Sequence, residues 1–254
     1  IEHTLFGTFQ NQANTAFWSF NWIAPATNVG TVTLYAAGNQ ANNDGTPDGD
    51  QIYTTSAAIQ PPAVVPRRAR ADFDGDGKSD VGVYRPPTGN WFINRSTDGF
   101  FASQFGISTD RIVPADYDGD NKSDLAVWRE NGASQAVFYI LSSSTNTFQG
   151  IGFGATGDLP AVGDWDGDGK ADPAVYRGGA QGAFYYLGSV SGSLSAIVWG
   201  VPGDLPLRGD FDGDGRSDAA VFRPSDGIWY ALQSSNGALF AVQWGISGDK
   251  LAPA

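Results

Sequence analysis

A nine-residue acidic motif occurs four times in this 254-residue chain, and its nearly even spacing limits the folds that the chain can adopt. The motif reads DFDGDGKSD at residues 72–80, DYDGDNKSD at 116–124, DWDGDGKAD at 164–172 and DFDGDGRSD at 210–218. Successive copies begin 44, 48 and 46 residues apart. A period of this length is typical of repeat proteins in which each unit is one supersecondary element.

Each motif is followed by the same three strand-like runs, separated by turns rich in Gly, Asn and Ser. In the first unit these runs are VGVYR (81–85), WFINRS (91–96) and QFG (104–106). A short segment with Pro then leads to the next motif, so each unit holds four strands. Four strands in 40–50 residues match one blade of a β-propeller, whereas a β-helix has shorter repeats and an α-solenoid has helical periodicity.

We therefore predict an all-β fold with four four-stranded propeller blades of about 46 residues over residues 71–254. The last ten residues, GISGDKLAPA (245–254), match GISTDRIVPA (106–115), which directly precedes the second motif. This match favours four blades that are part of a larger array, and the alternative is that the last strand closes the ring. The absence of Met indicates a processed or truncated chain.

The composition agrees with this fold and excludes several functions. With 34 Gly, 13% aromatic and only 17% charged residues, the chain favours strands and tight turns. The absence of Cys excludes disulfides, Cys-ligated zinc and thiol nucleophiles. A net charge of −12 argues against a nucleic-acid partner, and no apolar run is long enough to span a membrane as a helix.

The carboxylates of each motif are spaced as ligands of one cation. Asp occupies positions 1, 3, 5 and 9 of a tight loop, where the position-7 carbonyl can add a further oxygen. Position 6 calls for a left-handed backbone, which Gly provides in three loops and Asn121 in one. A flexible all-oxygen site suits Ca²⁺ better than Mg²⁺. Position 12 is Val in every loop, which excludes an EF-hand, because that motif needs Glu there.

The acidity of the chain belongs to these loops, which hold 16 of its 27 acidic residues. The remaining acids are outnumbered by 15 bases, so the rest of the surface is not acidic. A single loop of this kind could be an ordinary Asx-rich turn. Four such loops at the same place in four repeats favour metal binding.

Segments such as DFDGDGKSDVGVYR and DWDGDGKADPAVYR resemble the FG-GAP/VCBS repeats of integrin-α-type propellers and of secreted bacterial proteins, over roughly residues 64–254. The resemblance implies about four structural Ca²⁺ ions, one per repeat, in hairpin loops between the first two strands of each blade. The ligands that it implies are Asp72, Asp74, Asp76, the Lys78 carbonyl and Asp80; Asp116, Asp118, Asp120, the Lys122 carbonyl and Asp124; Asp164, Asp166, Asp168, the Lys170 carbonyl and Asp172; and Asp210, Asp212, Asp214, the Arg216 carbonyl and Asp218.

Residues 1–60 lack the repeat. The runs FWSFNWIAP (17–25), GTVTLYAAG (30–38) and QIYTTS (51–56) alternate as strands do. Together they resemble the C-terminal half of Reeler-like, choice-of-anchor β-sandwich domains of bacterial surface proteins, which implies a partial β-sandwich.

Two short features lie between this region and the repeats. Asp44, Asp48 and Asp50 could bind a further cation, but an ordinary polar turn is the favoured interpretation. Residues 61–70 are predicted to form a Pro-rich linker.

Nothing in the sequence indicates catalysis, since His3 is the only His and the clustered carboxylates are assigned to metal. A recurring Arg could form a basic ring for an anionic ligand, or, as we favour, tie each blade to a loop. A recurring aromatic residue could stack on sugars, or, as we favour, fill the core between blades. The two sets are Arg85, Arg129, Arg177 and Arg223, and Trp91, Phe138, Phe184 and Trp229.

The sequence thus favours a non-catalytic, calcium-stabilised scaffold, secreted or on the outer surface of a bacterial cell. Its partners would be other surface proteins or a larger assembly, and its role adhesion or protein assembly. The alternative is a lectin-like carbohydrate-binding module, or an accessory part of a polysaccharide-processing enzyme, with glycans as ligands.

Overall fold

The computed structural model describes residues 31–40, 45–59 and 70–251. These residues form strands and turns, with one short 3-10 turn, η1 (Pro86–Thr88), so the predicted all-β class is confirmed. The chain divides into two units, residues 1–64 and 65–254. Within the described part, no helix has the length and apolarity needed to cross a membrane.

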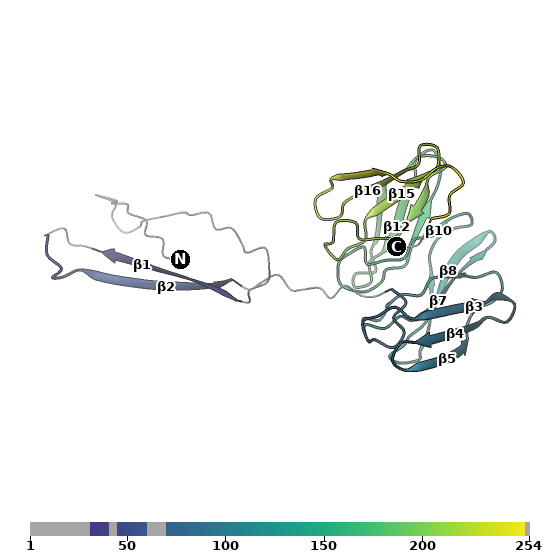
Figure 1. Ribbon diagram of the computed structural model, residues 1–254, viewed down its shortest axis with the longest axis horizontal. Coiled ribbons are helices and arrows are strands. Elements are labelled where there is room, and N and C mark those ends of the chain that lie inside the picture. Colours follow the sequence, from purple (N-terminus) through teal and green to yellow (C-terminus); the bar gives the residue numbers. More distant parts are fainter. Residues whose placement is uncertain (1–30, 41–44, 60–69, 252–254) are drawn as a thin grey trace. The chain divides into compact units, whose positions relative to one another are not determined.

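The first unit contains an antiparallel hairpin of β1 (Val32–Gln40) and β2 (Gln51–Ile59) (Figure 1). These strands confirm the runs predicted at 30–38 and 51–56, whereas the run at 17–25 lies outside the described residues. Every residue of β2 is exposed, so the hairpin as described has no core of its own. The partial β-sandwich and its Reeler-like resemblance stay predictions, and most of the predicted linker also lies outside the described residues.

The second unit holds four antiparallel sheets arranged as the blades of a four-bladed β-propeller (Figure 1). Blade 1 contains β3 (Val81–Arg85), β4 (Asn90–Arg95) and β5 (Gly99–Gln104); blade 2 contains β6 (Arg111–Ile112), β7 (Leu125–Asn131), β8 (Ser134–Leu141) and β9 (Phe148–Gly152); blade 3 contains β10 (Leu159–Pro160), β11 (Ala174–Arg177), β12 (Ala183–Leu187) and β13 (Leu194–Val198); blade 4 contains β14 (Leu205–Leu207), β15 (Ala219–Arg223), β16 (Ile228–Leu232) and β17 (Leu239–Gln243). Within each sheet the strands pair in sequence order.

Three blades have the predicted four strands, and blade 1 has three among its described residues. The segment before the first Asp loop, which corresponds to the opening strand of the other blades, includes residues outside the described ranges. In blade 3 the second strand begins one position later than in its neighbours, at Ala174. The residue before it is Pro173, whose missing N–H cannot join the ladder.

The hydrophobic core lies between successive blades. Trp91 of blade 1 packs with Val127 of blade 2, and Phe184 of blade 3 packs with Val221 of blade 4. The recurring aromatic residue is at most 3% exposed in blades 1–3, which confirms its predicted place in the core, and is half-buried as Trp229 in blade 4. Burying such a side chain contributes about 1.5–3 kcal/mol, so these contacts account for much of the adhesion between blades.

Candidate metal sites

In blades 2, 3 and 4 the Asp loop joins the first two strands, as the resemblance implied. Residues 116–124 connect β6 to β7, residues 164–172 connect β10 to β11, and residues 210–218 connect β14 to β15. The position-6 backbone is left-handed as predicted, with φ of 85° at Gly77 and 69° at Asn121. This bend folds each loop back on itself, so that carboxylates from both of its halves meet.

Three of the four carboxylates in every loop come together, those at positions 1, 3 and 9. One ligand oxygen of each lies within 4.8 Å of the other two. The triads are Asp72, Asp74 and Asp80; Asp116, Asp118 and Asp124; Asp164, Asp166 and Asp172; and Asp210, Asp212 and Asp218.

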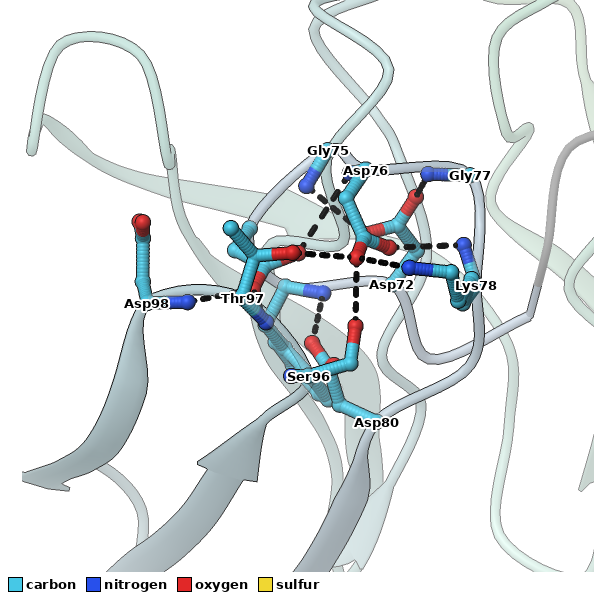
Figure 2. A network of polar contacts seen from close by, with 11 residues as sticks. Asp72, Gly75, Asp76, Gly77, Lys78, Asp80, Ser96, Thr97 and Asp98 are labelled. Atoms are coloured by element: carbon cyan, nitrogen blue, oxygen red, sulfur yellow. Dashed lines mark hydrogen bonds and ion pairs between the residues drawn. The ribbon is translucent and has the colours of Figure 1, made fainter.

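The position-1 carboxylate organises the loop backbone (Figure 2). Asp72 accepts hydrogen bonds from the backbone N–H of Gly75 at 2.6 Å and of Gly77 at 2.8 Å. The position-3 carboxylate, Asp74, accepts from the backbone N–H of Asp98 at 3.0 Å across the site. The hydrogen bond from Asp98 is the largest of the causes that hold the pKa of Asp74 below its usual value.

The position-9 carboxylate closes the loop and is buried in all four blades. Asp80 accepts from the backbone N–H of Phe73 and of Ser96, both at 2.7 Å. Burial raises the pKa of the equivalent Asp124 and Asp172 to about 6 despite similar backbone hydrogen bonds. These carboxylates are therefore costly to keep charged unless a cation joins them.

The position-5 carboxylate belongs to none of the triads and turns towards hydroxyl groups (Figure 2). Asp76 accepts from Ser96 Oγ and Thr97 Oγ1, both at 2.6 Å, and pairs with Lys78 Nζ at 2.9 Å. These bonds, led by that of Ser96, hold the pKa of Asp76 well below its usual range. The other position-5 residues make similar contacts to Ser143, Ser189 and Ser234.

That Ser was missed as a site residue by the sequence analysis. It follows the aromatic strand by one or two residues in all four repeats, and this regularity was the available signal. The position-7 carbonyls predicted as ligands stay predictions.

Adjacent loops are tied to one another through their backbones. The N–H of Ser123 donates to the carbonyl oxygen of Asp72 in the preceding loop at 2.5 Å. The same bond recurs from Ala171 to Asp116 at 2.7 Å and from Ser217 to Asp164 at 2.6 Å. Three residues that supply a triad carboxylate therefore also hold the next loop in place.

The position-7 side chains cover the preceding loop in the same way. A Cβ added to Gly75 would lie 3.1 Å from Lys122 Cε, and one added to Gly119 would lie 2.8 Å from Lys170 Cε. A side chain here would have to displace the Lys, and the left-handed backbone, with φ of 82° at Gly75 and 88° at Gly119, also favours Gly. Position 4 is Gly in all four loops, and in the first three a position-7 side chain of the following loop crosses it.

The donor set fits a hard divalent cation. Ca²⁺ binds oxygens at 2.3–2.6 Å, so two ligands on opposite sides of one ion lie up to about 5 Å apart. The spacing of 4.8 Å or less within each triad satisfies that limit. Three carboxylates with no nitrogen or sulfur donor also match the ligand preference of Ca²⁺.

At the other end of blades 2, 3 and 4, the recurring Arg pairs with an Asp. Arg129 donates from Nε to Asp110 Oδ1 at 2.6 Å and from Nη2 to Oδ2 at 2.9 Å. Arg177 pairs with Asp158 and Arg223 with Asp204 in the same bidentate way. The predicted tie between Arg and a loop is thus confirmed in three blades.

The Asp partners were not identified from the sequence. Their signal was a recurring Gly-Asp or Thr-Asp step, 19 residues before each of these Arg residues. In the first unit, Asp48 and Asp50 join no carboxylate group among the described residues, and Asp50 accepts from Asn39 Nδ2 at 3.1 Å. That contact agrees with a polar turn, while Asp44 lies outside the described residues.

Comparison with known families places these loops in context. The FG-GAP-like repeat family matches residues 72–127. This span begins at the first residue of loop 1 and ends within β7, just past loop 2, and the other two loops repeat its acidic pattern. The match and the blade arrangement together support an FG-GAP-type propeller. A search of curated proteins returns no match.

Proposed function

We propose that this chain is a calcium-stabilised, non-catalytic scaffold for adhesion or protein assembly at the cell surface. The observation that carries the proposal is the carboxylate triad, repeated at the same place in four successive blades. An FG-GAP-like match fits such a scaffold in general. Four equivalent sites suit a structural role better than a catalytic one, because catalysis needs a single differentiated centre.

A bound Ca²⁺ would supply the positive charge that the triads lack. Residues at positions 1, 3 and 9 would hold it, and the buried position-9 carboxylate would remain ionised beside it. Because adjacent loops share backbone hydrogen bonds, fixing one loop also restrains the next. We expect bound Ca²⁺ to make the end of the blades that carries the Asp loops rigid.

The size of two surface pockets is compatible with a scaffold. Two pockets at the boundary of blades 1 and 2 have volumes of about 190 and 290 Å³. Small-molecule sites usually occupy about 300–1,000 Å³. The first of these pockets is lined by Arg95, Lys122 and Ser143, and it lacks a nucleophile paired with a base.

A secreted or surface location, with a bacterial origin, is part of the proposal. Extracellular calcium sites commonly have Kd values of about 10⁻⁴–10⁻³ M, which abundant external calcium fills. The absence of Cys is compatible with that location, since the stability that disulfides often give would come from metal instead.

Equilibrium dialysis against radioactive calcium tests the metal sites. We expect about four ions per chain and the loss of one ion in each of the variants Asp124→Asn and Asp172→Asn. The matched control Glu130→Gln removes a carboxylate outside the loops and should retain all the ions. Failure to bind calcium in the millimolar range would refute the proposal.

A glycan array at millimolar calcium tests the partner class. A scaffold for proteins should show no selective sugar binding. Strong and selective retention of one glycan would replace the protein-assembly proposal with the lectin-like alternative.

A further inference from the structure

The smaller pocket at the boundary of blades 1 and 2 is lined by basic, polar and apolar residues, and none of its lining residues is acidic. Arg95 comes from blade 1 and Lys122 from the Asp loop of blade 2. The apolar part of the lining includes Phe73, Phe101 and Leu125. Two cations beside an apolar wall suit an anionic group that is carried on a short apolar stem.

The guanidinium of Arg95 is held in place without a close carboxylate partner. Its Nε donates to the carbonyl oxygen of Gly99 at 3.3 Å, and its Nη2 donates to that of Asp98 at 3.2 Å. The guanidinium carbon also lies 5.3 Å from the centre of the Phe101 ring. The Asp98 carboxylate is 3.6 Å from Nη1, which is beyond hydrogen-bonding distance. Nη1 can therefore donate to a further anion, and the fixed side chain loses little freedom when one binds.

Blade 2 adds two donors that have no partner within the described region. Lys122 forms no ion pair with a described carboxylate. Ser123 is only 7% exposed, and its hydroxyl lines the pocket without a hydrogen bond to any described residue. Leaving a buried hydroxyl unpaired is unfavourable, so a group that enters the pocket and accepts this hydrogen bond gains from it.

This combination of donors departs from the repeat. The residue before the Ser that contacts position 5 is Arg95 in blade 1, whereas the other blades have Ser142, Gly188 and Gln233. The counterpart of Ser123 in blade 3 is Ala171, so the boundary of blades 2 and 3 lacks both donors. A residue that recurs in every blade is explained by the fold, whereas these departures at a single boundary are not. They therefore indicate a binding site that belongs to this boundary alone.

The size of the pocket limits what it can hold. Its volume of about 190 Å³ is below the range of about 300–1,000 Å³ that is usual for small-molecule sites, so it suits one side chain of a larger partner. A Glu side chain offers a carboxylate to the two cations and two methylene groups to the apolar wall. The net charge of −12 repels acidic segments in general, so their binding needs a local cationic site such as this one.

We propose that the pocket between blades 1 and 2 binds a glutamate side chain of a partner protein. Arg95 and Lys122 bind the carboxylate, and Ser123 donates a further hydrogen bond to it. Phe101 and Leu125 cover the methylene groups. The inference rests on the proposed scaffold function, since it names the chemistry by which one partner is recognised. It does not depend on which cation occupies the Asp loops.

An array of immobilised heptapeptides with Glu or Gln at the central position and varied flanking residues tests this pocket. In millimolar calcium at low salt, the chain should bind Glu peptides at least tenfold more strongly than their Gln counterparts. Arg95→Gln should abolish this preference, and Ser123→Ala should weaken it severalfold. The matched control Arg111→Gln removes a guanidinium that pairs with Glu130 outside the pocket, at 3.3 Å, and should retain the preference.

Both pocket variants introduce residues that the repeat already accepts, since Gln233 and Ala171 occupy these positions in other blades. Folding should therefore survive, which circular dichroism can verify. Absence of peptide binding, equal binding of Glu and Gln peptides, or a preference that survives Arg95→Gln would overturn the inference.

Failure of this inference is distinguishable from failure of the proposed function. Calcium dialysis and the glycan array do not depend on Arg95, so the scaffold proposal stands if only the Glu preference is absent. Selective binding of a uronic-acid glycan that Arg95→Gln removes would assign the pocket to an acidic sugar. That result would overturn both the glutamate inference and the protein-assembly proposal.

Discussion

The two ends of blades 2, 3 and 4 neutralise buried aspartates in different ways. At one end the Asp110 side chain is fully buried, and a bidentate Arg129 balances its charge. At the other end Asp124 is equally buried, but the groups that face it are backbone N–H donors, the Ser143 side chain and the Asp118 carboxylate. The chain completes the first site with its own residues, whereas the second gathers negative charge.

This difference explains how Asp can have two roles in one repeat, as the partner of an Arg and as a candidate ligand of a cation. A guanidinium fixes a carboxylate in one direction and is present as soon as the chain folds. A triad of carboxylates remains strained by repulsion until a cation arrives. Stability at the loop end should therefore depend on the solution, and stability at the Arg end should not.

Removal of calcium should have the largest effect, because it acts on all four loops at once. At free calcium about five times Kd, each site contributes about 1 kcal/mol, and four sites contribute about 4 kcal/mol. Thermal unfolding with and without a chelator measures the loss, and added magnesium should restore little of it. An unchanged unfolding midpoint would mean that the triads hold no structural cation.

Loss of one Arg–Asp pair should reduce the free energy of unfolding slightly less than calcium removal does. This reduction should not depend on calcium. Arg129→Met leaves Asp110 buried without its partner, which we expect to reduce the free energy of unfolding by about 3 kcal/mol. Chemical denaturation in calcium and in chelator should give the same difference. Arg111→Met, which removes a partly exposed pair with Glu130, is the matched control and should cost less than about 1 kcal/mol.

The period of the acidic motif was sufficient to predict the blades. The spacing within the motif predicted that positions 1, 3, 5 and 9 would converge, and the structure brings together positions 1, 3 and 9 but not position 5. Both predictions follow from the spacing of residues along the sequence, because residues within one nine-residue loop cannot lie far apart. The hydroxyl contacts of position 5 could not be predicted in this way. Ser96 meets Asp76 across 20 residues, and only the register of the intervening strands brings them together.

The exposure of Val83 in blade 1 also could not be predicted from the sequence. Val83 and Val127 occupy the same repeat position, yet one is 60% exposed and the other is fully buried. Burial at this position depends on the preceding blade and not on the residue itself. A repeat pattern predicts what each unit can bury, but the neighbours of the unit decide what it does bury.

Acidification should weaken the loop end first. The folded pKa of Asp124 and Asp172 is about 6, above the usual value near 4, so protons compete with calcium below pH 6. Calcium affinity at these two sites should fall about fivefold between pH 6 and pH 5, because the ionised fraction of each carboxylate falls by about that factor. Calorimetric titration at both values measures the change. Constant affinity over this range would show that neither carboxylate binds the ion.

The same carboxylates should have the opposite effect on the calcium-free protein. A folded pKa raised above the unfolded value stabilises the fold below pH 4, and this stabilisation is lost as pH rises through 6. The contribution of Asp124 and Asp172 should therefore make the metal-free chain less stable at pH 7 than at pH 5. In saturating calcium this dependence should disappear or reverse.

The smallest expected effect compares one Asp from each end. Asp172→Asn removes a triad carboxylate, so its cost should be about 1 kcal/mol greater in calcium than in chelator. Asp158→Asn breaks the pair with Arg177, and its cost should be the same in both solutions because no cation is involved. Denaturant unfolding of both variants under both conditions gives the four values needed. If the two costs respond equally to calcium, the two ends of the blade are not chemically distinct, and the cation does not act through the position-9 carboxylate.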